Sequence, residues 1–290
     1  MPDHHRSFDL VRRLVRLIPD VPGKLRIARL ALHPFRKHDH FLIPDRYGNS
    51  ICCPSIEEPI ALELSANGVY EADTLALILQ RLPSKGVYLD VGANVGAMAL
   101  PVARQRPDAH VICIEADPDI AAILRRNVAE NRLANITIIE CLAGPCSKDE
   151  VQFYSAPVSK FGMGSVGKQF GLSPKLLQQV ALDQCLDRMG VDRVDIIKLD
   201  VEGAELGVLQ GIARRLTSAS PPVIVFEFND WAERRIEGQS AGAAQAYLRS
   251  LGFQTFRLES QGTLGPPLDQ PICEGGAMLL AQRQRLAACQ

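Results

Sequence analysis

Residues 87–96 read Val-Tyr-Leu-Asp-Val-Gly-Ala-Asn-Val-Gly, and they are the most informative part of the chain. The run begins with apolar residues and carries one acid, Asp90, close to its end. Gly92 and Gly96 follow, and apolar residues then recur at helical spacing through Val95, Ala99, Leu100 and Ala103. This pattern predicts a buried strand, a tight glycine turn and the start of a helix. Such a turn lets a ligand approach the backbone beside a helix N-terminus.

The acid at the end of this strand separates two kinds of nucleotide site. A dinucleotide site presents backbone N–H groups to a pyrophosphate, which the carboxylate of Asp90 would repel. A carboxylate instead suits a ligand that carries an ammonium group or sugar hydroxyls. S-adenosylmethionine carries both, so these residues favour it as the cofactor.

Beyond residue 57, apolar strand patterns alternate with helical ones. Strands are predicted at about 87–91, 110–115, 136–141, 194–199, 222–228, 253–258 and 276–281. This alternation is typical of an α/β fold whose mostly parallel sheet is covered by helices on both faces. No helical pattern separates the last two strands, so we expect them to pair antiparallel at one edge. Residues 57–285 are therefore predicted to form one α/β domain.

Residues 1–56 are predicted to form a small appendage of helices and a β-hairpin. Apolar residues near its start recur at helical spacing, and arginines cover the other face: Phe8, Val11, Leu14, Val15 and Ile18 against Arg6, Arg12, Arg13 and Arg16. Such a helix either caps the core or contacts an anionic membrane peripherally through residues 6–18. Residues 40–43 and 50–53 flank a turn and predict the hairpin.

The composition restricts the class of protein. A formal net charge of −1 over 290 residues does not indicate binding to nucleic acid through phosphate neutralisation. No apolar stretch reaches the roughly 20 residues of a membrane span, and no secretory signal is evident, so we expect a cytoplasmic protein. None of the eight cysteines forms a C-x-x-C pair, which gives a zinc site little support.

Further acids follow the ends of the other predicted strands. Glu115 ends the second strand, about 20 residues after the glycine turn, where an acid binds a ribose diol in nucleotide-binding α/β folds. Asp200 ends the fourth strand, at the edge where open α/β sheets bind ligands, and Glu202 follows it. Glu227 reaches the same edge from the fifth strand. Acids converging there would repel one another unless a cation occupied the site, and a sulfonium supplies that cation.

These acids are also the best candidates for general acid–base catalysis. An aliphatic hydroxyl is a poor nucleophile and gains from a nearby general base. No histidine lies at the ligand-facing ends of the core strands, so Asp200, Glu202 and Glu227 are the better catalytic candidates, with the histidines of the appendage as the alternative. Three acids can also hold a divalent cation through oxygen ligands, but no pattern demands one, so no metal is predicted. Residues 155–175, rich in Gly, Ser and Lys, predict a lid over the acceptor site or a surface loop.

Two runs of sequence together resemble the FkbM family of S-adenosylmethionine-dependent methyltransferases. They are Leu-Asp-Val-Gly-Ala-Asn-Val-Gly at 89–96 and Ile-Lys-Leu-Asp-Val-Glu-Gly-Ala-Glu at 197–205. The likeness extends over about residues 40–260. It implies a class I methyltransferase fold, a Rossmann-like sheet of seven strands with the last one antiparallel. It also implies methyl transfer to a hydroxyl oxygen of a small molecule, a sugar or a lipid-linked glycan.

The resemblance also implies roles for individual residues. The methionine part of the cofactor would be held by Asp90, Gly92, Ala93, Asn94 and Gly96. The ribose would be bound near Glu115 and Ala116, and the adenine near Leu142 and Ala143. Asp200 would face the methionine end and the transferring methyl, and Glu71 matches an upstream acid of the family.

Other functions remain open from the sequence. A nucleotide-dependent oxidoreductase would show G-x-G-x-x-G at the first turn, and this chain does not. A catalytically silent binding or scaffold protein can keep the same fold, but it would tolerate loss of Asp90, Glu115 or Asp200, and all three are present. N-methylation of protein or nucleic acid is a third alternative, which the net charge and the lack of an Asn-Pro-Pro-Tyr-type tetrad disfavour.

Overall fold

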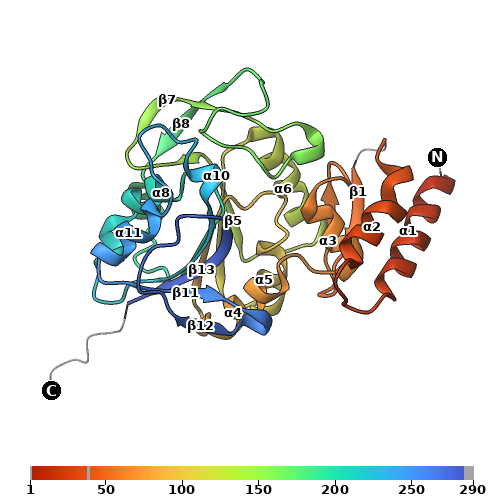
Figure 1. The fold of residues 1–290 in the computed structure, drawn as a ribbon, viewed down its shortest axis with the longest axis horizontal. Helices are drawn as coiled ribbons and strands as arrows, with labels where there is room; N and C mark the ends of the chain where they lie inside the picture. Colours follow the sequence, from red (N-terminus) through yellow and green to blue (C-terminus); the bar gives the residue numbers. More distant parts are fainter. Residues whose placement is uncertain (1, 38–39, 284–290) are drawn as a thin grey trace.

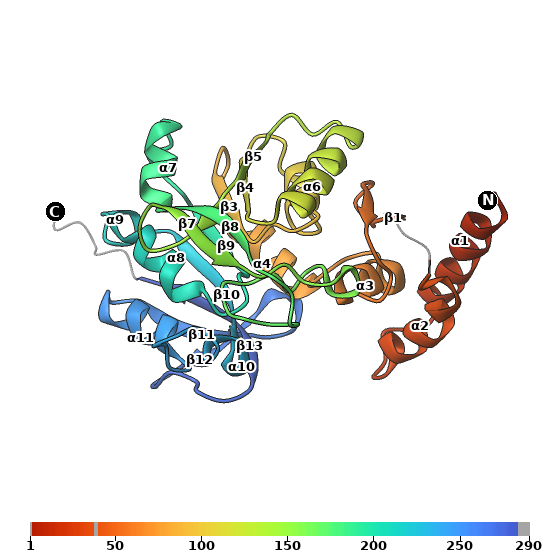
Figure 2. The same ribbon diagram turned by 90° about the horizontal axis from the view of Figure 1, so that it is seen from above.

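The computed structural model describes residues 2–37 and 40–283 of the chain, and it is built around one twisted eight-stranded sheet. Across the sheet the order is β12-β11-β13-β10-β9-β3-β4-β5 (Figures 1 and 2). The strands are β3 (Val87–Val91), β4 (His110–Glu115), β5 (Ile136–Glu140), β9 (Ile196–Leu199), β10 (Val223–Asn229), β11 (Gln254–Leu258), β12 (Leu264–Pro267) and β13 (Gly276–Gln282). The five strands from β5 to β10 run parallel, so their carboxyl ends meet at one edge.

Helices cover both faces of the sheet because successive strand residues point to opposite sides. On one face, Tyr88 of β3 joins a core with the helices nearer the N-terminus. On the other face, Leu89 and Val91 join a core with the later helices. The helices that follow the hairpin are α3 (Pro59–Asn67), α4 (Ala72–Arg81), α5 (Ala99–Gln105), α6 (Pro118–Glu130), α7 (Leu182–Arg188), α8 (Glu205–Gly211), α9 (Ala213–Leu216), α10 (Asp230–Glu233) and α11 (Ala243–Ser250).

The predicted fold class is confirmed, with two differences in the sheet. The seven predicted strands are all present, and the short strand β12 adds an eighth at the edge. The antiparallel strand β13 lies between β10 and β11 rather than at the edge. The crossover through α11 leaves one position open beside β10, and β13 fills it, pairing with both neighbours. In that place, β13 supplies hydrogen-bond partners to the backbone groups of β10 and β11, and they supply partners to β13.

Between β5 and β9, where the helix–strand alternation lapses, the chain forms a second, smaller sheet. Its order is β6-β8-β7, with β6 at Leu142–Ala143, β7 at Lys148–Phe153 and β8 at Lys175–Val180. The loop between β7 and β8 contains a short 3-10 helix at Val158–Lys160 and crosses the carboxyl edge of the main sheet.

The N-terminal segment packs on one end of the molecule (Figures 1 and 2). It consists of α1 (Pro2–Arg16), α2 (Lys24–Leu32), a 3-10 helix (His33–Phe35) and the predicted hairpin of β1 (Phe41–Pro44) and β2 (Ser50–Cys53). Phe8 and Val15 are buried in the same core cluster as Tyr88, which confirms that α1 caps the core. Leu14 of the same predicted stripe is instead 56% exposed.

The division of the chain at residue 56 stays a prediction, and residues 284–285 of the predicted domain lie outside the described part of the chain. No helix within the described ranges combines the length and apolar character that a membrane crossing requires.

Candidate active site

Two neighbouring cavities open where the parallel strands end. The first, here called the glycine-turn cavity, is lined by Gly92, Asn94, Glu115, Ala116, Leu142 and Ala143 among others. The second, here called the acidic cavity, has a volume of about 270 Å³ and is lined by Glu58, Glu71, Asp90, Ala93, Glu202 and Glu227 among others. Both are bordered by Gly92, Asn94, Gly162 and Asp200. All the predicted site residues except Gly96 therefore line one of two adjoining cavities.

Gly96 lines neither cavity, and its role is to let the turn pack tightly against neighbouring side chains. A Cβ at this position would lie 2.2 Å from a methyl carbon of Leu100 and 2.8 Å from one of Leu124, so no larger residue fits without rearrangement. Gly92 is restricted more severely, because a Cβ there would lie 1.9 Å from the carbonyl oxygen of Asp200. Its φ of +82° also belongs to the left-handed region that favours glycine. The turn thus brings the ends of β3 and β9 into contact.

Asp90 is a buried carboxyl group without a hydrogen-bond partner in the described structure. Its side chain is 1% exposed, and neither carboxyl oxygen receives a hydrogen bond. Burial, with Asp200 nearby, raises its pKa to about 6, although the Lys198 ammonium acts in the opposite direction. Because an unpartnered buried polar group is costly, its place in the cavity wall fits a ligand that brings a hydrogen-bond donor or a positive charge.

Glu115 holds the glycine turn from the neighbouring strand. The N–H of Asn94 donates to its Oε2 at 2.8 Å, and the N–H of Asp117 donates to its Oε1 at 2.9 Å. Burial raises the pKa of Glu115 to about 7. Each carboxyl oxygen keeps a further lone pair, so this group can still accept a hydrogen bond from a hydroxyl. Ala116 follows it in the cavity wall.

Leu142 and Ala143 form the buried strand β6, which enters the glycine-turn cavity from the small sheet. Cys141 precedes them and lines the same cavity. These side chains are largely apolar, and they give this end of the cavity a surface suited to an aromatic ring.

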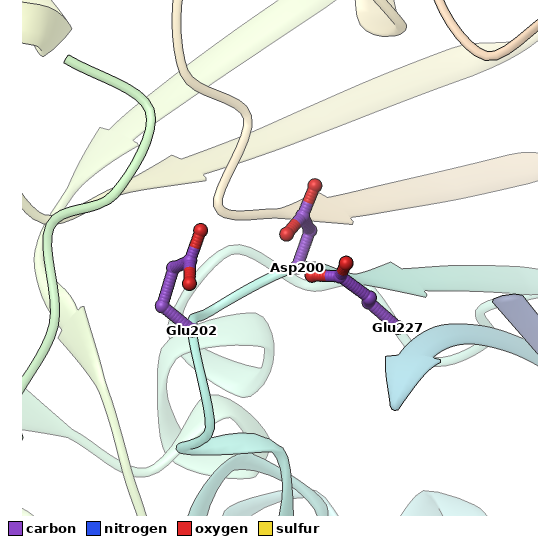
Figure 3. A group of neighbouring side chains, drawn as sticks. All are labelled: Asp200, Glu202 and Glu227. Carbon is purple, nitrogen blue, oxygen red and sulfur yellow. The ribbon is translucent and has the colours of Figure 1, made fainter. Parts of the chain in front are cut away.

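Three catalytic candidates come together at the ends of β9 and β10 (Figure 3). Asp200, Glu202 and Glu227 each offer a carboxyl oxygen within 4.8 Å of the other two. Burial and the charge of Asp200 raise the pKa of Glu202 to about 8 and that of Glu227 to about 9. The cluster has the oxygen ligands that a hard divalent cation takes, and it equally provides carboxyl groups that accept a proton once they are ionised, above neutral pH.

Lys198 supplies a cation inside this acidic region. Its Nζ lies 2.9 Å from Asp200 Oδ2 and 3.8 Å from Glu71 Oε2, and the side chain is 3% exposed. Burial alone would lower the pKa of Lys198, but Asp200, Glu71 and Asp90 together raise it. Asp200 is therefore paired, whereas no ion pair joins Glu202 or Glu227 to a cation among the described residues.

Three residues of the site adopt backbone conformations that are unfavourable for side-chain-bearing residues. Glu71, Asn94 and Glu202 have φ values of 43°, 52° and 53°. Residues held in this left-handed region cost of order 1–3 kcal/mol and cluster at functional sites. The strain falls on two acids and an amide that all line the acidic cavity.

Glu58 is a site residue that the sequence did not indicate. It lies 4% exposed at the N-terminus of α3, its Oε2 has no hydrogen-bond partner in the described structure, and it lines the acidic cavity. Burial and the charge of Asp200 raise its pKa to about 7. Its only local signal is an acid before a proline at a helix start, which is common. Lys198 had the stronger signal, a lysine inside a buried apolar strand.

The loop between β7 and β8 closes both cavities from outside. Phe161 is buried and lines the glycine-turn cavity, and Met163 lines the acidic cavity. A Cβ on Gly162 would lie 2.7 Å from Glu58 Oε1, so the loop backbone passes directly over that carboxyl group. Residues 161–163 of the loop predicted as a lid or a surface loop therefore lie against both cavities.

Comparison with known proteins places this site in a family. The model of the methyltransferase FkbM domain matches residues 90–255, more than half of the chain. Methyltransferase sdnD from Sordaria araneosa is 28% identical over 210 residues, which cover 62% of this chain and 78% of that protein. Hexuronic acid methyltransferase AglP from Haloferax volcanii is 27% identical over 151 residues, covering 52% of this chain and 59% of the relative.

Among solved structures, an O-methyltransferase from Bacillus cereus in complex with SAH aligns over 96% of this chain and 100% of its own, at 12% identity and a TM-score of 0.42. Because the family model covers more than half of the sequence, the protein belongs to the FkbM family of methyltransferases and uses S-adenosylmethionine as its methyl donor.

Proposed function

We propose that this protein transfers the methyl group of S-adenosylmethionine to a hydroxyl oxygen of a sugar, a lipid-linked glycan or another small molecule. The observation that carries the proposal is the acidic cavity, where unpaired carboxyl groups with raised pKa values stand beside the glycine turn. An alcohol is a weak nucleophile and gains from a base that takes its proton at the point of methyl transfer, whereas a neutral amine is nucleophilic enough without one.

The residues around the two cavities fit the chemical groups of this cofactor. Asp90, with Ala93 and Asn94 beside it, is suited to the ammonium end, and Glu71 adds a second carboxyl group nearby. Glu115 and Ala116 are suited to the ribose hydroxyls, and Leu142 and Ala143 to the adenine ring. Gly92 and Gly96 serve by keeping the turn tight. When bound, the cofactor supplies an electrophilic methyl group on a positively charged sulfur.

The chain then has to align and deprotonate the acceptor. We assign the proton-accepting role to Glu227 or Glu202, because their raised pKa values make them stronger bases than ordinary carboxylates. Asp200, paired with Lys198, orients the acceptor and the positive charge between the two cavities. The carboxylate would take the hydroxyl proton while the methyl carbon exchanges its bond to sulfur for one to the hydroxyl oxygen, so the carboxyl group would end the turnover protonated.

A carbohydrate acceptor is supported by one of the relatives. That relative is a hexuronic acid methyltransferase, so a carbohydrate is a substrate class within reach of this family. The formal net charge of −1 argues against a nucleic acid acceptor. All the cysteines of the described residues are free thiols, which fits activity in a reducing, cytoplasmic compartment.

The experiment is an acceptor screen by mass spectrometry. The purified chain is incubated with S-adenosylmethionine and separate pools of sugar nucleotides, lipid-linked glycans and small alcohols. We expect an acceptor to gain the mass of one methylene unit, with a methoxy signal in its NMR spectrum. Methylation on nitrogen or carbon would contradict the proposal. Cofactor binding by calorimetry without turnover in any pool would favour a binding or scaffold protein that keeps the fold.

A further inference from the structure

The first helix carries apolar side chains on two opposite faces. Phe8 and Val15 are 4% and 3% exposed and pack into the core. Leu10, Leu14 and Leu17 are 60%, 56% and 79% exposed. Spacings of four and three residues place these leucines on one stripe, about half a turn away from the buried face. The core thus accounts for one apolar face and leaves the other uncovered.

Exposed apolar residues continue along the second helix. Val21, which precedes this helix, is 48% exposed, and Leu25, Ile27 and Leu30 within it are 37%, 47% and 72% exposed, while Ala28 and Leu32 of the helix are buried. Of the twelve large hydrophobic side chains that are exposed in the described residues, eight lie between residues 10 and 42. Such a concentration marks an interaction surface, since exposed apolar residues are normally scattered singly.

The charged residues around these side chains are nearly all basic. The exposed cations of the two helices and the segment after them are Arg6, Arg13, Arg26, Arg29, Arg36 and Lys37. Residues 6–37 hold only two acids, Asp20, which is exposed, and Asp9, which is paired with Arg12. The chain as a whole has a net charge of −1, so this end of the molecule differs sharply from the rest.

We propose that α1 and α2 dock on an anionic lipid bilayer through this surface, which we call the N-terminal docking surface: the exposed leucines, valine and isoleucine of residues 10–30 and the six exposed cations. Leucine stripes flanked by arginines are the pattern of helices that lie in the membrane interface. Apolar residues enter the boundary with the acyl chains, and arginines bind the anionic headgroups. A protein partner would need both an apolar surface against the leucine stripe and negative charges against the basic side chains. The helices stand at one end of the molecule, free of other elements on their outer side (Figure 2).

The same surface borders a route toward the active site. A cavity of about 380 Å³, here called the α2 cavity, is lined by Arg29, Leu32, His33 and Arg36 from the N-terminal segment. It shares Glu58, Pro59 and Met163 with the acidic cavity. Docking would therefore place the bilayer beside an opening that leads to the methyl-transfer site. The docking surface itself does not depend on which acceptor is methylated.

Binding to vesicles tests the proposal directly. The full chain is sedimented with vesicles of phosphatidylcholine alone and with vesicles that also contain phosphatidylglycerol. We expect binding to the anionic vesicles only, weakened as salt is raised, because headgroup charges are screened. The double variant Leu14→Glu/Leu17→Glu should lower the bound fraction at least about tenfold. Replacing Arg26 with Gln should lower it about fivefold.

The matched control is Leu176→Glu, which changes a leucine of β8 that is 58% exposed and lies outside the N-terminal segment. It should bind vesicles like the unchanged chain. Circular dichroism and a thermal melt show whether each variant is folded. We expect all of them to fold, because the replaced leucines are exposed. Equal binding to neutral vesicles, or no binding at all, would overturn the proposal. So would a dimer in sedimentation that the double variant dissociates, because the surface would then be an interface between copies.

Discussion

Asp90 combines two properties that a purely structural residue avoids. It is buried at the end of β3, and its carboxyl oxygens have no hydrogen-bond partner in the described structure. Lys198, the nearest strong cation, is already engaged by Asp200. Lys198 and Tyr88 offset part of the free energy lost by burying Asp90, and a ligand that brings a donor or a positive charge would offset more of it. Glu115 differs, because it serves the turn through two backbone N–H groups even without a ligand.

This difference leads to a prediction about cofactor affinity and stability. Asp90→Ala and Glu115→Ala should each weaken binding of S-adenosylmethionine by at least about 1–3 kcal/mol, the loss expected for a charged hydrogen bond. Asp90→Ala should not lower the unfolding midpoint of the ligand-free protein, whereas Glu115→Ala should, since it frees two buried N–H groups. Calorimetry and thermal melts measure both, with the exposed Asp149→Ala as control. Unchanged affinity in the first two variants would refute the assignment of the cofactor site.

The raised pKa values of the acid cluster predict a pH dependence. A general base must be deprotonated, so turnover should rise with pH through the pKa of that base. Glu202 and Glu227 have pKa values of about 8 and 9, which puts the rise between about pH 7 and 9 rather than near pH 4. Glu227→Gln should lower kcat about a hundredfold or more, with little change in cofactor affinity.

The pH–rate profile of the variant and of the exposed Glu237→Gln control separates the possibilities. If the rising limb stays unchanged in Glu227→Gln, the base is Glu202 or Glu58 instead. A flat profile in the unchanged protein from pH 5 upward would contradict a carboxyl base with a raised pKa.

Helix α6 connects the N-terminal hairpin with the glycine turn. The side chain of Asn127 is fully buried, and its Oδ1 accepts from the N–H of Cys52 at 2.8 Å. Its Nδ2 donates to the carbonyl oxygens of Val95 at 2.8 Å and Cys52 at 3.1 Å. One turn later, Asn131 bonds both backbone groups of Ser50. Two asparagines on one helix face thus fasten strand β2 beside the turn that borders the site.

We therefore expect Asn127→Ala to lower the free energy of unfolding by about 1–3 kcal/mol, because it leaves buried backbone groups without partners. Urea unfolding followed by circular dichroism measures the change. Arg126→Ala on the exposed side of the same helix is the control, because its ion pair with Glu130 is solvent-exposed and worth little. Equal effects of the two substitutions would show that α6 does not hold the hairpin in this way.

Across the molecule, the carboxyl groups of the acidic cavity outnumber its cations. Glu58, Glu71, Asp90, Glu202 and Glu227 line the cavity together with Asp200, whereas Lys198 is its only lysine or arginine among the described residues. Raised pKa values of about 6 to 9 follow from this crowding and from burial. Two arrangements satisfy such a site: partial protonation completed by a positively charged cofactor, or a bound divalent ion.

We favour the first arrangement, since Lys198 already neutralises Asp200 at the centre of the cluster. Methyl transfer should accordingly be unchanged after exhaustive dialysis against EDTA and insensitive to added Mg²⁺. The initial rate of methyl transfer measures both, and calorimetry with Mg²⁺ alone gives a readout that does not depend on turnover. Loss of activity that Mg²⁺ restores, together with heat of Mg²⁺ binding that Glu227→Gln abolishes, would assign the cluster to a metal.

Local patterns in the sequence were enough to predict the seven main strands, the glycine turn and the acids at the strand ends. These features depend on residues a few positions apart, and parallel strands bring their carboxyl ends to one edge without further information.

What the sequence could not indicate depends on contacts between distant segments. Glu58 enters the cavity only because α3 docks against the edge of the sheet, and β13 inserts beside β10 only because a position is open there. In the same way, the apolar pattern of α1 was visible, but only its packing decided that Phe8 is buried and Leu14 exposed. Whether a side chain is buried depends on the elements that pack against it in the tertiary structure. The spacing of apolar residues along one helix does not show which face those elements cover.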